Sequence, residues 1–221
     1  MSGLRVTVAG AAGRMGETVC RAVDAAPDMI LAARADPALG VAVADVLAET
    51  DVLVDFTTPS TVVENARAAV AAGVDVVIGT TGFSVADIPA GPGKTFIAPN
   101  FAIGAVLMMR FAAEAAQHMA AAEIIELHHD RKVDRPSGTA ALTAQLMAKA
   151  APGRAEIPIH SVRLPGLVAH QEVIFGDLGQ TLTIRHDSTD RESFMPGVLL
   201  AIRRVGELTE SPVVGLERLL F

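Results

Sequence analysis

Aromatic side chains are scarce in this 221-residue chain, which has eight phenylalanines but no tryptophan and no tyrosine. Proteins that bind single-stranded nucleic acids stack successive bases on aromatic rings, so we expect no such platform here. Positive charge is in deficit too, because 18 Lys and Arg stand against 25 Asp and Glu, a formal net charge of -7 at pH 7. Since nucleic-acid binding depends mainly on clustered Lys and Arg, we expect no nucleic-acid partner.

Cysteine and long apolar runs are also nearly absent. The single Cys20 cannot form a disulfide within the chain, and we expect it to be buried in the first helix. The most apolar segment, 101–116, contains Arg110 and Glu114 and is shorter than the ~20 apolar residues that a membrane span needs. The opening MSGLRVTVAG has too short an apolar run for a signal peptide. We therefore expect a cytoplasmic protein with no membrane partner.

Apolar residues are abundant, at 51% of the chain against 19% charged residues, which is typical of a compact globular protein. Over the first hundred residues, short β-branched runs alternate with alanine-rich segments of helical periodicity. This alternation predicts an α/β fold with a Rossmann-like, doubly wound parallel sheet. The expected strands are 4–9, 29–33, 52–56, 74–78 and 95–98, with a helix at 60–72 that Gly73 ends.

The pattern changes after residue 100 and predicts a second α+β domain with a mostly antiparallel sheet. Leu182 and Ile184 alternate with polar residues, as in an antiparallel strand that has one covered face. The expected helices are 103–120, 138–150 and 194–208, and the expected strands are 123–127, 157–164, 168–175 and 180–185.

The first strand leads directly into GAAGRMG, with glycines at positions 10, 13 and 16. Such a turn lets the backbone approach a pyrophosphate, whose charge then lies at the helix N-terminus. The spacing is GxxGxxG, because Ala12 stands where the usual dinucleotide motif has its middle glycine. The alternative is a tight turn with close helix packing and no ligand.

Asp36 follows the second strand, where an acidic side chain can hydrogen-bond the adenosine ribose of a dinucleotide. Alternatively, it is an ordinary loop residue before Pro37. A 2'-phosphate would need a nearby cation, and Arg34 is the local candidate. The sequence therefore leaves NADH, NADPH or both open as the cofactor.

Three later strands end in polar or glycine-containing segments: DFTTP at 55–59, GTTG at 79–82 and APNF at 98–101. Ligands of open α/β sheets bind beyond the carboxyl ends of the strands. Each segment alone is more often a turn, but their recurrence at successive strand ends favours a binding site.

The segment ELHHDRKVDRPSGTA, 126–140, gathers positive charge in an acidic chain. His128, His129 and Lys132 supply cations and proton donors, and the helix that starts at Ser137–Gly138–Thr139 offers free N–H groups to a carboxylate. A solvated loop before an ordinary helix cap is the alternative. We expect no metal site, because adjacent histidines on a strand point to opposite faces and no further ligand spacing supports one. The pattern favours a site for an anionic substrate.

Together, several segments resemble the dihydrodipicolinate reductase family, the 4-hydroxy-tetrahydrodipicolinate reductases of bacterial lysine and diaminopimelate synthesis. The resemblance covers nearly the whole chain in order, and the HHxxKxDxPSGTA element is its most specific part. The segments are VAGAAGRMG, VDFT, GTTGF, APNF, ELHHDRKVDRPSGTA, VAHQEV and TIRHDS.

The resemblance implies reduction of a small cyclic dicarboxylate by NADH and/or NADPH. His128 corresponds to the catalytic proton donor and Lys132 to its partner, and His129, Gly138 and Thr139 correspond to substrate contacts, to which the helix start adds Ser137. The implied cofactor-binding residues are Gly10, Ala11, Ala12, Gly13, Arg14, Met15, Asp36, Phe56, Gly79, Thr80, Thr81, Ala98, Pro99, Asn100 and Phe101.

On the same resemblance, residues 1–100 and 187–221 form the dinucleotide-binding domain. Residues 101–186 form the substrate-binding and oligomerisation domain, whose sheet would build a homotetramer. The chain departs from the family pattern at Pro37, where a basic residue is usual, and in two short segments, 84–94 and 149–158. We expect the other histidines, at 118, 160, 170 and 186, to make structural hydrogen bonds.

Three other functions stay open from the sequence. The first is a reductase of the same architecture that acts on another small imino or keto acid. The second is a non-catalytic, nucleotide-binding regulator, and the third is a metal hydrolase.

Overall fold

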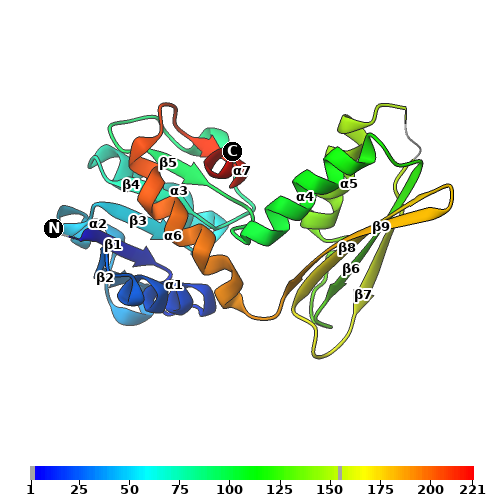
Figure 1. Ribbon diagram of the computed structural model, residues 1–221. Helices are drawn as coiled ribbons and strands as arrows, with labels where there is room; N and C mark the ends of the chain where they lie inside the picture. Colours follow the sequence, from blue (N-terminus) through cyan, green and yellow to red (C-terminus); the bar gives the residue numbers. More distant parts are fainter. Residues whose placement is uncertain (1–2, 154–155) are drawn as a thin grey trace. The chain divides into compact units, whose positions relative to one another are not determined.

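A computed structural model describes residues 3–153 and 156–221 of the chain (Figure 1). The described residues form two compact units. The first unit contains the chain up to Phe101 together with Phe194–Phe221, and the second unit is Ala102–Ser193. Within the described ranges, no helix has the length and apolar character that crossing a membrane requires.

The first unit is built on a six-stranded sheet in which every pair of neighbouring strands is parallel. The strand order is β10-β5-β4-β3-β1-β2, so the order along the sheet reverses direction at β1. The strands are β1 (Leu4–Ala9), β2 (Met29–Ala35), β3 (Val52–Asp55), β4 (Asp75–Ile78), β5 (Thr95–Ile97) and β10 (Val213–Val214). Ligands of such sheets bind beyond the carboxyl ends of the strands, where the order reverses.

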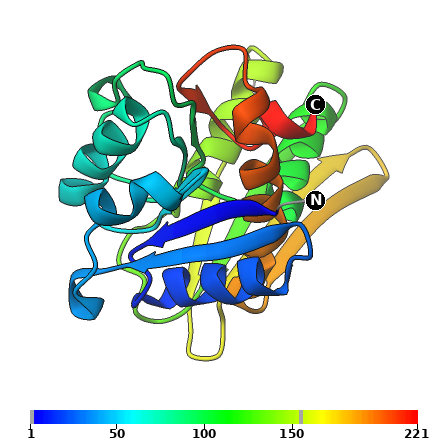
Figure 2. The same cartoon turned by 90° about the vertical axis from the view of Figure 1, so that its left-hand side faces the viewer.

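Helices cover both faces of this sheet: α1 packs against α6 on one face, and α2 packs against α3 on the other (Figure 2). Because both faces are covered, the central strands are nearly continuous apolar runs. Cys20 is a buried residue of α1, as predicted. The helices are α1 (Arg14–Ala25), α2 (Val43–Val46), α3 (Pro59–Ala71), α6 (Met195–Arg204) and α7 (Glu217–Leu220), with 3-10 turns at Pro37–Leu39, Leu47–Glu49, Val85–Asp87, Arg191–Phe194 and Val205–Glu207.

The second unit is a four-stranded sheet with two helices on one face. The strand order is β7-β6-β8-β9, in which β6 and β7 are parallel and the other neighbours are antiparallel. The core between sheet and helices contains Ile124, Met147, Val173 and Phe175, and burying a side chain of this size contributes roughly 1.5–3 kcal/mol. The elements are α4 (Ile103–Ala116), β6 (Ala121–His128), α5 (Gly138–Ala150), β7 (Ile159–Arg163), β8 (Ala169–Asp177) and β9 (Gln180–Ser188).

The predicted fold class is therefore confirmed, and the differences concern the ends of elements and short elements that the sequence did not predict, among them α2 and α7. Helix α4 stops at Ala116 rather than near residue 120, and the sequence did not predict β10, which is only two residues long. The chain returns to the first unit at Phe194 rather than at residue 187, because β9 stays paired with β8 as far as Ser188. The roles assigned to the two parts of the chain stay predictions.

Candidate active site

The glycine turn joins β1 to α1 in the first unit. Gly10 has φ +76°, a conformation that favours glycine. At Gly16, a Cβ atom would collide with the Gly10 carbonyl oxygen, so the helix runs close against the turn. Gly13 occupies the N-cap and contributes no side-chain cap, which leaves the first-turn amides of α1 without that partner. Uncapped amides at a helix N-terminus suit a pyrophosphate, so these residues fit a dinucleotide.

Asp36 lies directly beside this turn. Its carboxylate accepts hydrogen bonds from the backbone N–H groups of Ala12, at 3.1 Å, and Ala38, at 2.9 Å. A carboxylate has about four acceptor positions, so it retains capacity for ribose hydroxyls. Arg34 lies in an exposed ion pair with Asp24, at 3.4 Å. Asp36 therefore lies next to the glycine turn, and Arg34, the local candidate for a 2'-phosphate, is paired with Asp24; the cofactor contacts of both residues stay predictions.

Sequence reasoning missed Asp55, which organises the strand ends of this unit. Its fully buried carboxylate accepts from the backbone N–H and hydroxyl of Thr57, from the Asn65 amide at 2.9 Å and from the Thr80 hydroxyl at 2.9 Å. These donors lie in the loop after β3, on α3 and in the loop after β4. Asp55 therefore fixes two of the predicted cofactor loops to each other. The detectable signal was an acidic residue at the end of an apolar strand, followed by two threonines.

Phe56 lies next to two other predicted cofactor residues, Gly79 and Phe101. A Cβ atom at Gly79 would collide with the Phe56 ring, and the rings of Phe56 and Phe101 lie with centroids 6.0 Å apart. Phe101 and Ala98 are buried, so their side chains support the ends of the strands from within the core. The predicted residues that are exposed are Ala12, Gly13, Arg14, Thr81 and Pro99.

The second unit brings the residues of 126–140 into one cluster. Glu126 and His128 point to the same face of β6, and Nδ1 of His128 is hydrogen-bonded to the Glu126 carboxylate. Lys132 follows in the loop, where its Nζ lies 2.8 Å from Asp134 Oδ1. His129 is exposed. The cluster therefore combines an imidazole, an ammonium group and the start of α5.

The start of α5 is capped by Ser137, yet there is unfilled space beside Gly138. Ser137 is buried, its hydroxyl accepts from the Ala140 N–H at 3.2 Å, and its own N–H donates to Glu126 at 3.3 Å. Gly138 is exposed, its φ is not positive, and an added Cβ would meet nothing within 4 Å. The backbone therefore does not require glycine at position 138. Space left beside a helix N-terminus is consistent with close approach of a ligand.

The electrostatics of the cluster act on His128 in two directions. Burial lowers the pKa of His128, the hydrogen bond to Glu126 opposes that shift, and the positive charges of Lys132 and Arg163 add to it; the net pKa is lowered. For Glu126, burial alone raises the pKa, but hydrogen bonds from Arg163, Ser161 and His128 outweigh it, and the net pKa is lowered. Glu126 is therefore ionised and accepts hydrogen bonds.

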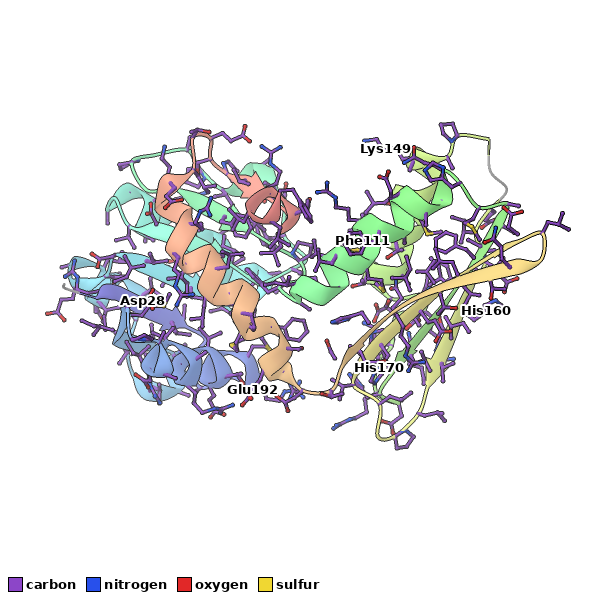
Figure 3. All side chains as sticks on the ribbon, in the orientation of Figure 1. Asp28, Phe111, Lys149, His160, His170 and Glu192 are labelled. Carbon is purple, nitrogen blue, oxygen red and sulfur yellow. The ribbon has the colours of Figure 1, made fainter. Side chains whose placement is uncertain are left out.

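The remaining histidines lie outside this cluster. Figure 3 labels His160 on β7 and His170 on β8. His160 pairs with Glu123 at 2.7 Å, and His170 pairs with Asp187 at 2.7 Å. His186 is partly buried against Gly104. Within the described parts of the chain, no group of three His, Cys, Asp or Glu side chains could hold a metal ion.

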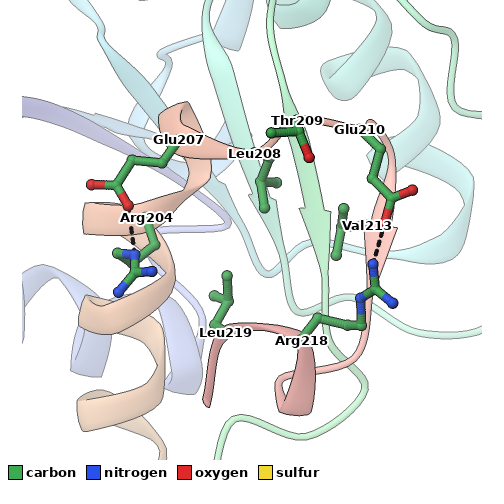
Figure 4. Close-up of a pocket in the computed structure, with 8 residues that line it drawn as sticks. All are labelled: Arg204, Glu207, Leu208, Thr209, Glu210, Val213, Arg218 and Leu219. Atoms are coloured by element: carbon green, nitrogen blue, oxygen red, sulfur yellow. Dashed lines mark hydrogen bonds and ion pairs between the residues drawn. The ribbon is translucent and has the colours of Figure 1, made fainter. Parts of the chain in front are cut away.

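Two surface hollows lie elsewhere. One in the first unit, about 220 Å³, is lined by charged residues that are already paired, Arg204 with Glu207 and Arg218 with Glu210 (Figure 4). The other, about 610 Å³, lies in the second unit near the end of α4 and the start of β6. Neither contains a predicted site residue, so the assignment rests on the two clusters described above.

Family models match both parts of the chain. The model described as "Dihydrodipicolinate reductase, N-terminus" matches residues 4–90, and "Dihydrodipicolinate reductase, C-terminus" matches residues 104–220. The chain belongs to the dihydrodipicolinate reductase family. The family predicted from the sequence motifs is thus confirmed.

Curated relatives carry the name 4-hydroxy-tetrahydrodipicolinate reductase. The protein of Mycolicibacterium smegmatis is 47% identical over 244 residues, which cover 98% of this chain and 99% of the relative. That of Desulfitobacterium hafniense is 44% identical over 267 residues and the full length of both chains.

Solved structures agree with this family. The dipicolinate-bound dihydrodipicolinate reductase from Paenisporosarcina sp. TG-14 is similar with a TM-score of 0.84 and 38% identity, over 98% of this chain and 99% of that chain. A probable dehydrogenase from Thermotoga maritima, 14% identical with a TM-score of 0.66 over 98% of this chain and 92% of its own, shares the fold alone.

Both curated alignments are longer than this chain of 221 residues, so these dihydrodipicolinate reductases contain residues that it lacks. The sequence predicts short segments at 84–94 and 149–158. The first forms the loop and 3-10 turn before β5. The second includes residues 154 and 155, which lie outside the described ranges.

Proposed function

We propose that this chain is a nicotinamide-dependent reductase that converts 4-hydroxy-tetrahydrodipicolinate to tetrahydrodipicolinate in lysine and diaminopimelate synthesis. The observation that carries the proposal is the cluster of the second unit, in which Glu126 links His128 to the start of α5 and the charge of Lys132 acts on His128. An imidazole, an ammonium group and helix N–H groups suit a ring with two carboxylates. The solved relative from Paenisporosarcina with bound dipicolinate supports a ligand of that chemical class.

The nucleotide belongs to the first unit in this proposal. The uncapped start of α1 takes the pyrophosphate, Asp36 takes a ribose, and the loops that Asp55 joins hold the rest of the dinucleotide. When bound, the reduced nicotinamide supplies a hydride. Because Pro37 stands where a basic residue would receive a 2'-phosphate and Arg34 is paired with Asp24, we expect NADH to be accepted.

The chain's own residues supply the proton and the orientation of the ring. The conversion releases the 4-hydroxyl group as water and adds one hydride and one proton to the ring, and His128 donates the proton to the ring position that gains electron density. Lys132 and the N–H groups at Gly138 and Thr139 hold the carboxylates, with His129 and Ser137 beside them; the N–H of Ser137 itself donates to Glu126. A positioned general acid contributes about 10² to 10⁴ in rate, and the oriented binding adds to it.

The proposal also includes the assembly and the location. The open face of the second unit's sheet would join copies of the chain into a homotetramer, as the family resemblance implies. A biosynthetic enzyme of this kind is expected in the cytoplasm.

The decisive test is reduction of the enzymatically generated substrate by the purified protein, with NADH and NADPH compared side by side by their absorbance. The variant His128→Gln should lower kcat by about 10² to 10⁴ and leave NADH binding unchanged, because the imidazole acts on the ring. Full turnover of this variant contradicts the role of His128. A protein that binds NADH but reduces neither this ring nor related imino and keto acids is a regulator, and loss of activity with a chelator points to a metal hydrolase.

A further inference from the structure

Glu126 is a charged residue that is fully buried on the covered face of the second unit's sheet. Its side chain is 0% exposed. A buried carboxylate costs several kcal/mol unless it is paired and hydrogen-bonded. Arg163 on β7, whose side chain is 2% exposed, supplies the pairing with two hydrogen bonds, from Nη1 to Oε2 at 2.8 Å and from Nη2 to Oε1 at 2.7 Å. Such a fork-to-fork pair is geometrically specific.

Strand register brings this pair to His128. Strands β6 and β7 are parallel, with Glu126 opposite Ser161 and His128 opposite Arg163. Since alternate residues of a strand share a face, Glu126, His128 and Arg163 all point toward the covered face of the sheet. Oε2 of Glu126 then serves both Arg163 and Nδ1 of His128, while Oε1 also accepts the N–H of Ser137.

Arg163 also connects the pair to the loop that carries Lys132. Besides its bonds to Glu126, it donates to the carbonyl oxygen of Val162 at 2.7 Å and to that of Asp134 at 2.7 Å. Its four terminal N–H groups thus all have acceptors, two on the buried carboxylate and two on backbone carbonyls. A guanidinium held at four points has one orientation, and it fixes the carboxylate in turn.

The hydrogen-bond inventory decides which nitrogen of His128 carries the proton. An ionised carboxylate only accepts hydrogen bonds, so the proton between Glu126 and His128 must be on Nδ1. The hydrogen bond at Nδ1 fixes the tautomer of the ring. Nε2 is therefore the nitrogen that remains available to hold a transferable proton.

We propose that Glu126 and Arg163 are a positioning pair that keeps a proton on Nδ1 of His128, so that Nε2 is the atom that gives its proton to the substrate. The pair touches no reacting atom and acts through His128. The part of this inference that concerns proton transfer rests on the proposed function; the tautomer does not.

Arg163 has a second effect, because it balances the charge of Glu126. The charged groups that act on His128 are Glu126 from its own strand, Arg163 from β7 and Lys132 from the loop, while β8 places Ala169 opposite it. Without this counter-charge the carboxylate would favour the imidazolium more strongly and raise the pKa of His128. With Arg163 in place, Glu126 orients the imidazole while its charge is offset.

The tautomer is measured directly on the unaltered protein, labelled with ¹⁵N-histidine and observed by NMR through a pH titration. We expect neutral His128 to carry its proton on Nδ1. A neutral form protonated on Nε2 overturns the proposal. Because this measurement needs no substrate, it decides the question even if the protein does not reduce the proposed ring.

The variant Glu126→Gln tests the consequence for turnover. The NH₂ group of the new amide would face an unsuitable partner in either orientation. In one orientation it faces Arg163 and the Ser137 N–H, which are themselves donors. In the other it faces His128, whose Nδ1 would have to become an acceptor. We expect kcat to fall on the order of 10- to 100-fold, with NADH binding unchanged. Losses of this size are usual when a group that hydrogen-bonds the non-reacting nitrogen of a functional histidine is replaced. The pH above which activity falls should also move lower, because Glu126 favours protonated His128.

Glu207→Gln is the matched control, since it removes the same charge from another ion pair with an arginine. Glu207 lies in the first unit, exposed and paired with Arg204, so kcat and its pH profile should match the wild type. A folded Glu126→Gln protein with wild-type kcat and pH profile overturns the proposal. If this variant does not fold, the NMR tautomer of the wild-type protein still supports or overturns it.

Discussion

At the scale of single residues, His128 is the group whose surroundings matter most. Burial takes its pKa below the ordinary histidine value of 6.5, and the hydrogen bond to Glu126 limits the shift. A general acid must be protonated before it can donate, so activity that depends on His128 is present below its pKa and lost as the pH rises through it. A bound dianion nearby would favour the imidazolium and raise that pKa.

We therefore expect two different pH profiles. The ratio kcat/KM reports the free protein and should fall as the pH rises through a value below 6.5, whereas kcat reports the complex and should fall at a higher pH. Initial rates over a pH series at saturating NADH, with the substrate concentration varied, give both curves. Identical profiles for kcat and kcat/KM, or a kcat/KM that still rises above pH 6.5, contradict this account of His128.

At the scale of elements, two helices begin at predicted binding sites, and each has a glycine in its first turn. The structural reason for glycine differs between the two positions. Gly16, in the first turn of α1, has the carbonyl oxygen of Gly10 where a Cβ atom would lie. Gly138, the first residue of α5, has open space there and no positive φ. The first glycine is required by packing within the chain. The second is free of that requirement, and the proposed substrate explains it.

Replacement by alanine separates these two cases. Gly16→Ala should lower the free energy of unfolding by about 1–3 kcal/mol, the usual cost of overpacking, and weaken NADH binding. Gly138→Ala should leave stability unchanged or raise it by up to about 1 kcal/mol, because alanine is the better helix former, yet raise KM for the dicarboxylate. Denaturant unfolding and steady-state kinetics check both. An unchanged KM in Gly138→Ala means that the ligand does not use this space.

Elements also show which parts of the fold were readable. The buried parallel strands were predicted within a few residues, because burial on both faces demands continuous apolar runs. Strand β10, Val213–Val214, was not, because two residues carry no periodicity and form a strand only through pairing with β5. The end of β9 was placed early for a similar reason: His186, Asp187 and Ser188 are polar, and their pairing with β8 extends the strand.

At the scale of the whole molecule, one face of the second unit's sheet is left without helices. Ile125, Leu127, Val162 and Ile174 point to that face by strand alternation and are only partly buried. Ion pairs of Arg185 with Glu172 and Asp187, at 2.9 Å each, lie beside them. A partly apolar face bordered by charged pairs suits contact between copies of the chain.

We expect the protein in solution to have about four times the mass of the 22.9 kDa chain, measured by sedimentation or light scattering. Ile125→Glu should dissociate this assembly, because it places an unpaired charge in the apolar part of the interface. Ile30→Glu, at an isoleucine of the first unit that is 51% exposed, is the control and should not change the mass. A wild-type monomer, or an Ile125→Glu protein of unchanged mass, excludes this face as the interface.

The sequence by itself determined the order of the longer strands and helices, the glycine turn, and the grouping of His128, Lys132 and the helix start. These features depend on the spacing of residues that are close together in the sequence. That spacing determines the periodicity of a helix or strand and the position of a helix cap. Only the tertiary structure decided that Glu126 meets Arg163, 37 residues away, and that Asp55 joins Thr80 and Asn65. Such contacts depend on strand register and on which strands are neighbours, and no local pattern of residues encodes either.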